Sequence, residues 1–74
     1  MSMYKNAENH LRNGGIIPIL RSHKNMSQGD LGKLLGVTSK YINDMEHGRR
    51  AVSLKMAKKL SVIFNRRTER FLPL

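Results

Sequence analysis

The sequence predicts an all-α fold, built as one small domain of short helices. Apolar residues recur at spacings of three and four along most of the chain, and no stretch alternates apolar and polar residues as a half-buried strand does. Glycine or asparagine ends most of these stretches, and serine or threonine precedes several of them. A chain of 74 residues makes one domain, whose core is of marginal size.

The first fifteen residues are expected to form a helical extension that is separate from the main domain at 16–74. Met3, Ala7 and Leu11 repeat every four residues, which favours a leading helix up to residue 12. The Asn-Gly-Gly sequence at 13–15 is then expected to break that helix.

The first helix of the main domain is expected over residues 16–24. Proline is tolerated only in the first turn of a helix, so Pro18 places the start of regular helix near Ile17. Asn25 is a suitable left-handed residue to end the helix.

Two short helices joined by a tight turn are expected between Ser27 and Gly48. Ser27 is a favourable N-cap, and Asp30 three residues later gives a weak capping box. Gly36 ends the first helix and Thr38 caps the second. The residues predicted to face inward are Leu31, Leu34 and Leu35 in the first helix and Ile42 and Met45 in the second. Helices in this arrangement form a helix-turn-helix motif, here at 27–48.

The last full helix is expected to begin after Ser53 and to end at Asn65, and a short turn is expected at 68–72. Its predicted inward residues are Leu54, Ala57, Leu60 and Phe64, and its predicted outward residues are Lys55, Lys58 and Lys59. Five apolar residues lie outside the inward stripe and form a candidate dimer patch: Met56, Val62, Ile63, Phe71 and Leu72. The alternative is that the leading helix covers this patch within one chain.

Charge indicates the class of partner. The chain has 14 Lys and Arg against 5 Asp and Glu, a net charge of +9 and a pI of about 10.7, which favours nucleic-acid binding over a generally basic protein. Cysteine is absent, so we expect a cytoplasmic protein without disulfides or thiolate metal sites. We expect no membrane span or signal peptide, since no apolar run is long enough. No catalytic or metal-binding spacing is present, so neither an enzyme nor a cofactor is predicted.

Four parts of the motif carry a resemblance to a known family: Ser27-Gln28, Leu35-Gly36-Val37, Ile42 and Met45-Glu46-His47-Gly48-Arg49-Arg50. Together they resemble the lambdoid-repressor family, also called the Cro/C1 or Xre-type helix-turn-helix family, over roughly residues 16–72. The resemblance implies a compact five-helix, lambda-repressor-like DNA-binding domain, here with an added N-terminal helix. Pro18 departs from the family pattern.

The resemblance also implies which residues meet DNA. In the family, the start of the second motif helix, here 39–47, reaches base edges through positions that match Ser39, Lys40, Asn43 and Asp44. Lysine can donate to guanine, asparagine can pair with adenine and aspartate can accept from cytosine, whereas serine is permissive. The alternative is an ordinary solvated helix face. The candidate phosphate contacts are Gln28, Thr38, Tyr41, His47, Arg49 and Arg50. Arg21 and Glu46 match a structural ion pair of the family.

These features predict a transcriptional regulator that binds double-stranded DNA, with repression at a near-palindromic operator by a homodimer as the leading hypothesis. The alternative is an antitoxin-type protein that binds a toxin partner, through the leading helix or through the apolar residues 71–74, and regulates its own operon. Adsorption to a membrane surface through the lysines of the last helix is disfavoured, because the apolar face of that helix is needed for the core.

Overall fold

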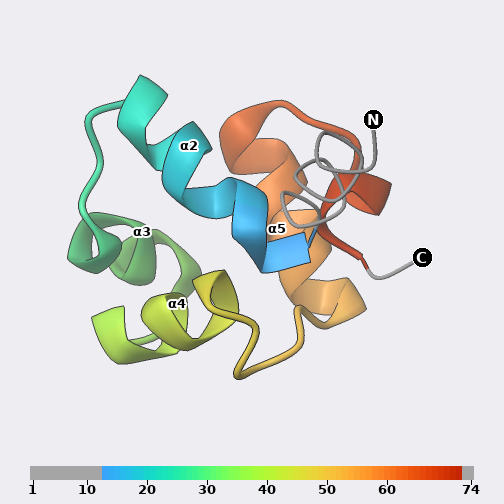
Figure 1. Cartoon of the computed structure of the whole chain (residues 1–74). Helices are drawn as coiled ribbons and strands as arrows, with labels where there is room; N and C mark the ends of the chain where they lie inside the picture. The colour runs from blue at the N-terminus through green and yellow to red at the C-terminus, as the bar shows by residue number, and fades with distance from the viewer. Residues whose placement is uncertain (1–12, 73–74) are drawn as a thin grey trace, which may run out of the picture.

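The computed structural model describes residues 13–72 (Figure 1). The elements in chain order are η1 (Asn13–Ile16), α2 (Ile17–His23), α3 (Gln28–Leu35), α4 (Ser39–Glu46), α5 (Leu54–Phe64) and η2 (Thr68–Phe71). Within the described residues these are four α-helices and two 3-10 helices, without a strand, which confirms the all-α prediction but not the count of five helices. The predicted leading helix lies outside the described residues.

Side-chain caps begin the three longest helices, as predicted. The Ser27 hydroxyl accepts from the backbone N–H of Asp30 at 2.9 Å, and the Asp30 carboxylate accepts from the Ser27 N–H at 3.1 Å, which completes the capping box. The pKa of Asp30 is lowered first by the hydrogen bond from the Ser27 backbone and then by the hydrogen bond with the Ser27 hydroxyl, with a further contribution from the charge of Lys33. Desolvation opposes these effects but does not outweigh them. Thr38 and Ser53 cap α4 and α5 through their hydroxyl oxygens.

The predicted helix ends are mostly confirmed. Helix α2 begins at Ile17 with the proline in its first turn, and Asn25 and Asn65 adopt left-handed φ angles of 55° and 53°. Gly36 caps α3 with φ 76°. Helix α4 ends at Glu46, one residue before the predicted end at 47.

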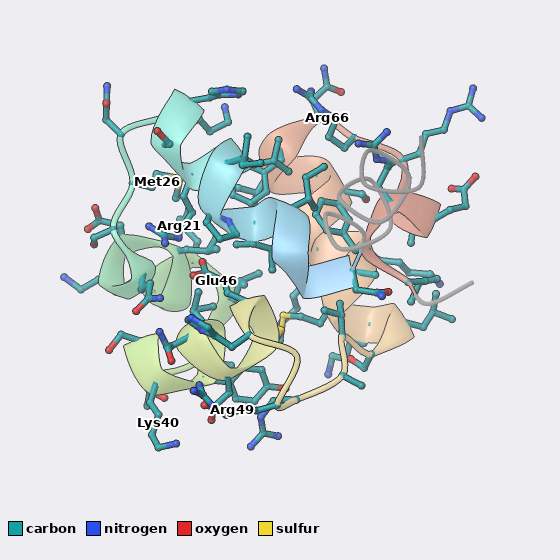
Figure 2. The ribbon with its side chains drawn as sticks, in the orientation of Figure 1. Arg21, Met26, Lys40, Glu46, Arg49 and Arg66 are labelled. Carbon is teal, nitrogen blue, oxygen red and sulfur yellow. The ribbon has the colours of Figure 1, made fainter. Side chains whose placement is uncertain are left out.

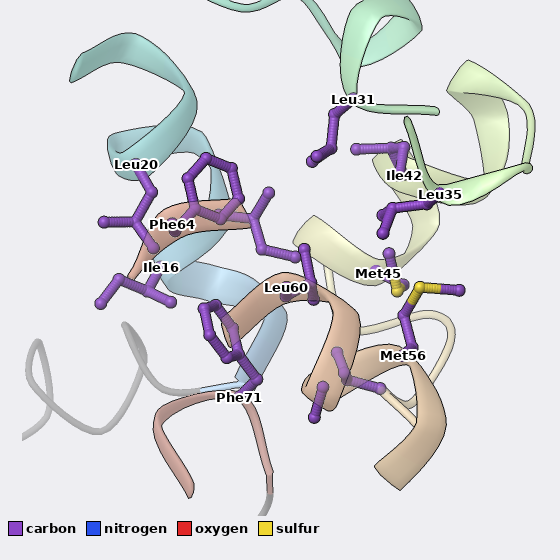
Figure 3. Close-up of a cluster of buried hydrophobic side chains, with 13 residues drawn as sticks. Ile16, Leu20, Leu31, Leu35, Ile42, Met45, Met56, Leu60, Phe64 and Phe71 are labelled. Carbon is purple, nitrogen blue, oxygen red and sulfur yellow. The ribbon is translucent and has the colours of Figure 1, made fainter. Parts of the chain in front are cut away.

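The core draws on every element (Figure 3). Its fully buried members include Ile17 from α2, Leu31 from α3, Ile42 from α4, Leu60 from α5 and Phe71 from η2. Burial of these side chains removes apolar surface from water and holds together helices that are too short to be stable alone. No helix in the described part of the chain combines the length and apolar character needed to cross a membrane.

Two predicted core residues are wrong. Leu34 is 62% exposed and Leu54 is 53% exposed. On α3 the inward face passes through Leu31 and Leu35, four residues apart, so Leu34 lies to one side. On α5 the buried stripe passes through Met56, Ala57, Leu60 and Phe64, and Leu54 falls to one side of it.

The candidate dimer patch is also corrected by the structure. Met56 and Phe71 are buried in the core of the domain itself, and Ile63 and Leu72 are partly buried against it. Of the five residues predicted for the patch, Val62 alone is exposed, at 81%. The predicted patch is therefore not a continuous apolar surface.

The Asn-Gly-Gly segment forms most of the 3-10 helix η1, with Asn13 at a left-handed φ of 59°, and the helix that it was expected to break lies outside the described residues. A Cβ atom on Gly14 would lie 1.8 Å from the carbonyl oxygen of Met45, so η1 approaches the end of α4 closely enough to require glycine. Gly32 has the same role inside the motif, since a Cβ there would lie 2.5 Å from the carbonyl oxygen of Val37. These close approaches place η1 against α4 and the turn before α4 against α3.

Candidate nucleic-acid interface

The outer face of α4 is presented by the packing of α4 on α3. Ile42 and Met45 are buried on the inner side of α4, so the opposite side of the helix faces away from the core. Ser39 and Lys40 lie at the start of the helix and are exposed, whereas Asn43 and Asp44 one turn later are half-buried. The structure therefore brings the four candidate base-contact residues together on one helix surface.

These side chains contact one another. The Nζ of Lys40 donates to Oδ2 of Asp44 at 3.1 Å, and the Nη1 of Arg49 lies 3.7 Å from Oδ1 of the same carboxylate. Arg49 also donates from Nη1 to Oδ1 of Asn43 at 3.3 Å. We call these four residues, Lys40, Asn43, Asp44 and Arg49, the α4 polar network. Figure 2 shows Lys40 and Arg49 at the same edge of the molecule.

The charges of this network act on Asp44. The hydrogen bond from Lys40 lowers the pKa of the Asp44 carboxyl, and the charges of Lys40, Arg49 and Arg50 lower it further, against the opposing effect of desolvation. Asp44 is therefore a carboxylate at neutral pH. It is an internal anion in a surface that is otherwise cationic.

The candidate phosphate contacts surround the network. Arg50 stacks over the ring of Tyr41 with its Cζ 4.2 Å from the ring centroid, a cation–π contact that orients the guanidinium. His47 places Nδ1 2.9 Å from the carbonyl oxygen of Asn43, at the end of α4. The hydroxyl of Thr38 accepts from the backbone N–H of Tyr41 at the start of the helix.

A second polar cluster joins α2, the loop before α3 and the end of α4 (Figure 2). Arg21 donates to the Glu46 carboxylate from Nε at 2.6 Å and from Nη2 at 3.2 Å, and Nη1 donates to the carbonyl oxygen of Met26 at 2.9 Å. The Glu46 side chain is 3% exposed and that of Arg21 is 17% exposed. One arginine thus ties α2 to the loop before α3 and to the end of α4.

Gln28 belongs to this cluster as well. Its Nε2 donates to Oε1 of Glu46 at 2.9 Å, so the candidate phosphate contact is attached to the buried ion pair in the free protein. Neither this contact nor the one between Arg21 and the loop carbonyl follows from the sequence pattern. No local pattern reveals them, because Gln28 and Glu46 are 18 residues apart and meet only after α3 and α4 have packed.

The geometry agrees with comparisons to known proteins. A family model described as helix-turn-helix matches residues 19–71. The ImmF control region 10 kDa protein of Bacillus phage phi105 is 31% identical over 52 residues, which cover 70% of this chain and 58% of that protein. The chain thus spans less than two thirds of the length of this relative. No solved structure matches.

Proposed function

This chain belongs to the Cro/C1-type helix-turn-helix family, and we propose that it is a sequence-specific DNA-binding transcriptional regulator that reads the major groove with α4. The observation that carries the proposal is the outer face of α4, on which polar and cationic side chains stand together while the opposite face is buried. The net charge of +9 supports a polyanionic partner. The name of the phage relative supports a role in control.

Base reading is assigned to the start of α4. Lys40 has an 83% exposed side chain and can donate to guanine O6 and N7. Asn43 can pair with adenine, and Asp44 can accept from the N4 amino group of cytosine. Ser39 at the first position of the helix can contact any base edge.

Phosphate contacts are assigned to the residues around this helix face. They fix the register of α4 in the groove without reading sequence. Gln28 lies at the start of α3, where free backbone N–H groups also favour an anion. The remaining candidates, which lie in the first turn of α4 or flank the helix, are Thr38, Tyr41, His47, Arg49 and Arg50.

Repression by a homodimer at a near-palindromic operator completes the proposal. Two copies of α4 would enter successive major grooves about 34 Å apart, and the bound dimer would block the promoter. Sedimentation at micromolar concentration, with and without DNA, tests this part. We expect a dimer on operator DNA, and a monomer under both conditions would contradict the palindrome.

The function itself is tested by an anisotropy titration against the DNA upstream of the gene and against a scrambled sequence, at about 150 mM salt. We expect a preference of about a thousandfold for the specific DNA. Lys40→Ala should reduce the specific affinity by about 1–3 kcal/mol and leave binding to scrambled DNA much less affected. A site selected from a random DNA library serves the same purpose if the regulated promoter lies elsewhere.

Equal and strongly salt-dependent binding to every DNA tested would contradict the proposal. Such a result would reduce the role of α4 to phosphate electrostatics. A stable protein that copurifies from the native host would then direct attention to the antitoxin alternative.

A further inference from the structure

An acid lies at the centre of the surface proposed to meet DNA. Asp44 is on the outer side of α4, its side chain is 17% exposed, and its carboxylate faces Lys40 on one side and Arg49 on the other. Its carbonyl oxygen also accepts the backbone N–H groups of Arg49 and Arg50, at 2.9 Å and 3.2 Å. The chain after α4 is therefore folded back so that an arginine side chain reaches the carboxylate.

Helix stability does not account for this arrangement. A lysine four residues before an aspartate is the less favourable order for a pair on a helix, and an exposed pair contributes little in water. An acid on a DNA-facing surface also repels phosphates over about 8 Å at physiological salt. The position of Asp44 is thus a cost to general DNA affinity.

We infer that Asp44 sets specificity by holding Lys40 and Arg49 away from non-specific phosphates. The inference rests on the proposed function, because it concerns the same surface. Every DNA sequence presents phosphates. To contact a phosphate, Lys40 and Arg49 must give up their interaction with the Asp44 carboxylate, which competes with the phosphate for the two cations. On the operator, contacts from Lys40 to base edges compensate for the lost interaction with Asp44. On other sequences no such contacts form, so the binding is weaker. Specificity is the ratio of the two affinities, so weaker non-specific binding raises it.

Asp44 also acts as a positioning residue. The Arg49 guanidinium lies against its carboxylate and donates to the amide oxygen of Asn43 at 3.3 Å. The Asp44 carboxylate therefore orients Lys40 directly and orients Asn43 through Arg49. Both of the oriented side chains are candidates for base reading, so removing the charge should loosen the reading surface as well as free its cations.

The test compares the affinities of three proteins for scrambled duplex DNA and for the specific site, over a range of salt concentrations. The proteins are the wild type, Asp44→Asn and the control Glu69→Gln. Both substitutions remove one negative charge, but Glu69 is exposed in η2 and holds no ion pair within residues 13–72. The control therefore measures the effect of net charge alone.

We expect Asp44→Asn to bind scrambled DNA about fivefold to tenfold more tightly at about 150 mM salt, and its salt dependence to steepen by about one or two phosphate contacts. Glu69→Gln should change binding by less than about twofold. The ratio of specific to non-specific affinity should fall by about fivefold or more in Asp44→Asn. Asp44→Glu, which keeps the charge, should restore most of the wild-type behaviour.

A second arm shows whether the cations are the cause. Asp44→Asn is also made in a protein that already carries Lys40→Ala. Its effect on the logarithm of the non-specific affinity should then be about half as large, because only Arg49 remains to be released. Thermal melting of each variant confirms that it is folded.

Two results would overturn the inference. One is an Asp44→Asn protein that matches Glu69→Gln on scrambled DNA. The other is a loss of affinity confined to sites with cytosine at one position, with no gain of affinity for scrambled DNA, which would leave Asp44 with its proposed base contact alone. A wild type without sequence preference would refute the proposed function instead, and the comparison on scrambled DNA would still decide the role of Asp44.

Discussion

Two charged regions of this domain differ in how their cations are held. On the outer face of α4, Lys40 and Arg49 share the carboxylate of Asp44. The second region, which we call the α5–η2 surface, has six exposed cations: Lys55, Lys58, Lys59, Arg66, Arg67 and Arg70. None of these six takes part in an ion pair within residues 13–72.

The difference shows that the number of charges does not locate the recognition surface. A cation held by a neighbouring acid has a defined direction, which base reading requires. An unpaired lysine on a flexible stem is a mobile point charge, and it attracts any polyanion over a distance that salt limits to about 8 Å. We therefore expect the α4 face to control specificity and the α5–η2 surface to control general attraction.

The largest expected effect comes from Glu46, the buried acid at the end of α4. Glu46→Ala leaves the partly buried Arg21 and the amide of Gln28 without their acceptor, so the free energy of unfolding should fall by about 3 kcal/mol. Glu69→Ala on the α5–η2 surface should change it by less than about 0.5 kcal/mol. Urea denaturation measures both. Equal effects of the two substitutions would show that the ion pair of Arg21 and Glu46 does not hold α4 in place.

The close packing of α3 on the turn before α4 provides the next test. Gly32→Ala places a methyl group 2.5 Å from the backbone oxygen of Val37, so we expect a loss of about 1–2 kcal/mol despite the better helix propensity of alanine. In Gly29→Ala, in the same helix, the new methyl group would lie 3.7 Å from the Ser27 hydroxyl oxygen, an ordinary contact distance, so the substitution should stabilise the fold by about 0.5–1 kcal/mol. Thermal melting compares the pair. Stabilisation by both would show that the motif has room at Gly32.

The α5–η2 surface is tested by removing two of its charges. Lys58→Ala combined with Lys59→Ala should weaken binding to the specific site and to scrambled DNA by the same factor, about threefold at about 150 mM salt. The preference between the two DNAs should stay constant. A changed preference would place these lysines at the recognition surface after all.

The smallest expected effect is on stability at acid pH. Hydrogen bonds and nearby cations lower the pKa values of Asp30 and Asp44, so each carboxylate stabilises the fold above its unfolded pKa of about 3.9 and loses that contribution as the pH falls through its folded value. Urea denaturation of the wild type and of Asp30→Asn at pH 7 and pH 3 should show a difference between the two proteins that shrinks at the lower pH. A difference that stays constant would contradict the role of the charge.

Local signals in the sequence predicted the ends of the elements well. Ser27, Thr38 and Ser53 cap helices through their own side chains, and Asn25 and Asn65 end them in left-handed conformations. Helix caps involve residues within one turn of each other, so they can be predicted from the local sequence. The inward faces were predicted less well, because Leu34 and Leu54 fit a helical period but lie beside the stripe that tertiary packing buries.

The sequence by itself determined the all-α class, the helix-turn-helix motif and the identity of the residues on the outer face of α4. Tertiary structure alone decided how those residues are held. Gln28 reaches Glu46, Arg21 reaches the carbonyl of Met26, and η1 packs on the end of α4 through Gly14. The physical reason is one of range, since caps and helical periods act between neighbours in the chain, whereas buried ion pairs and close backbone approaches join segments that only packing brings together.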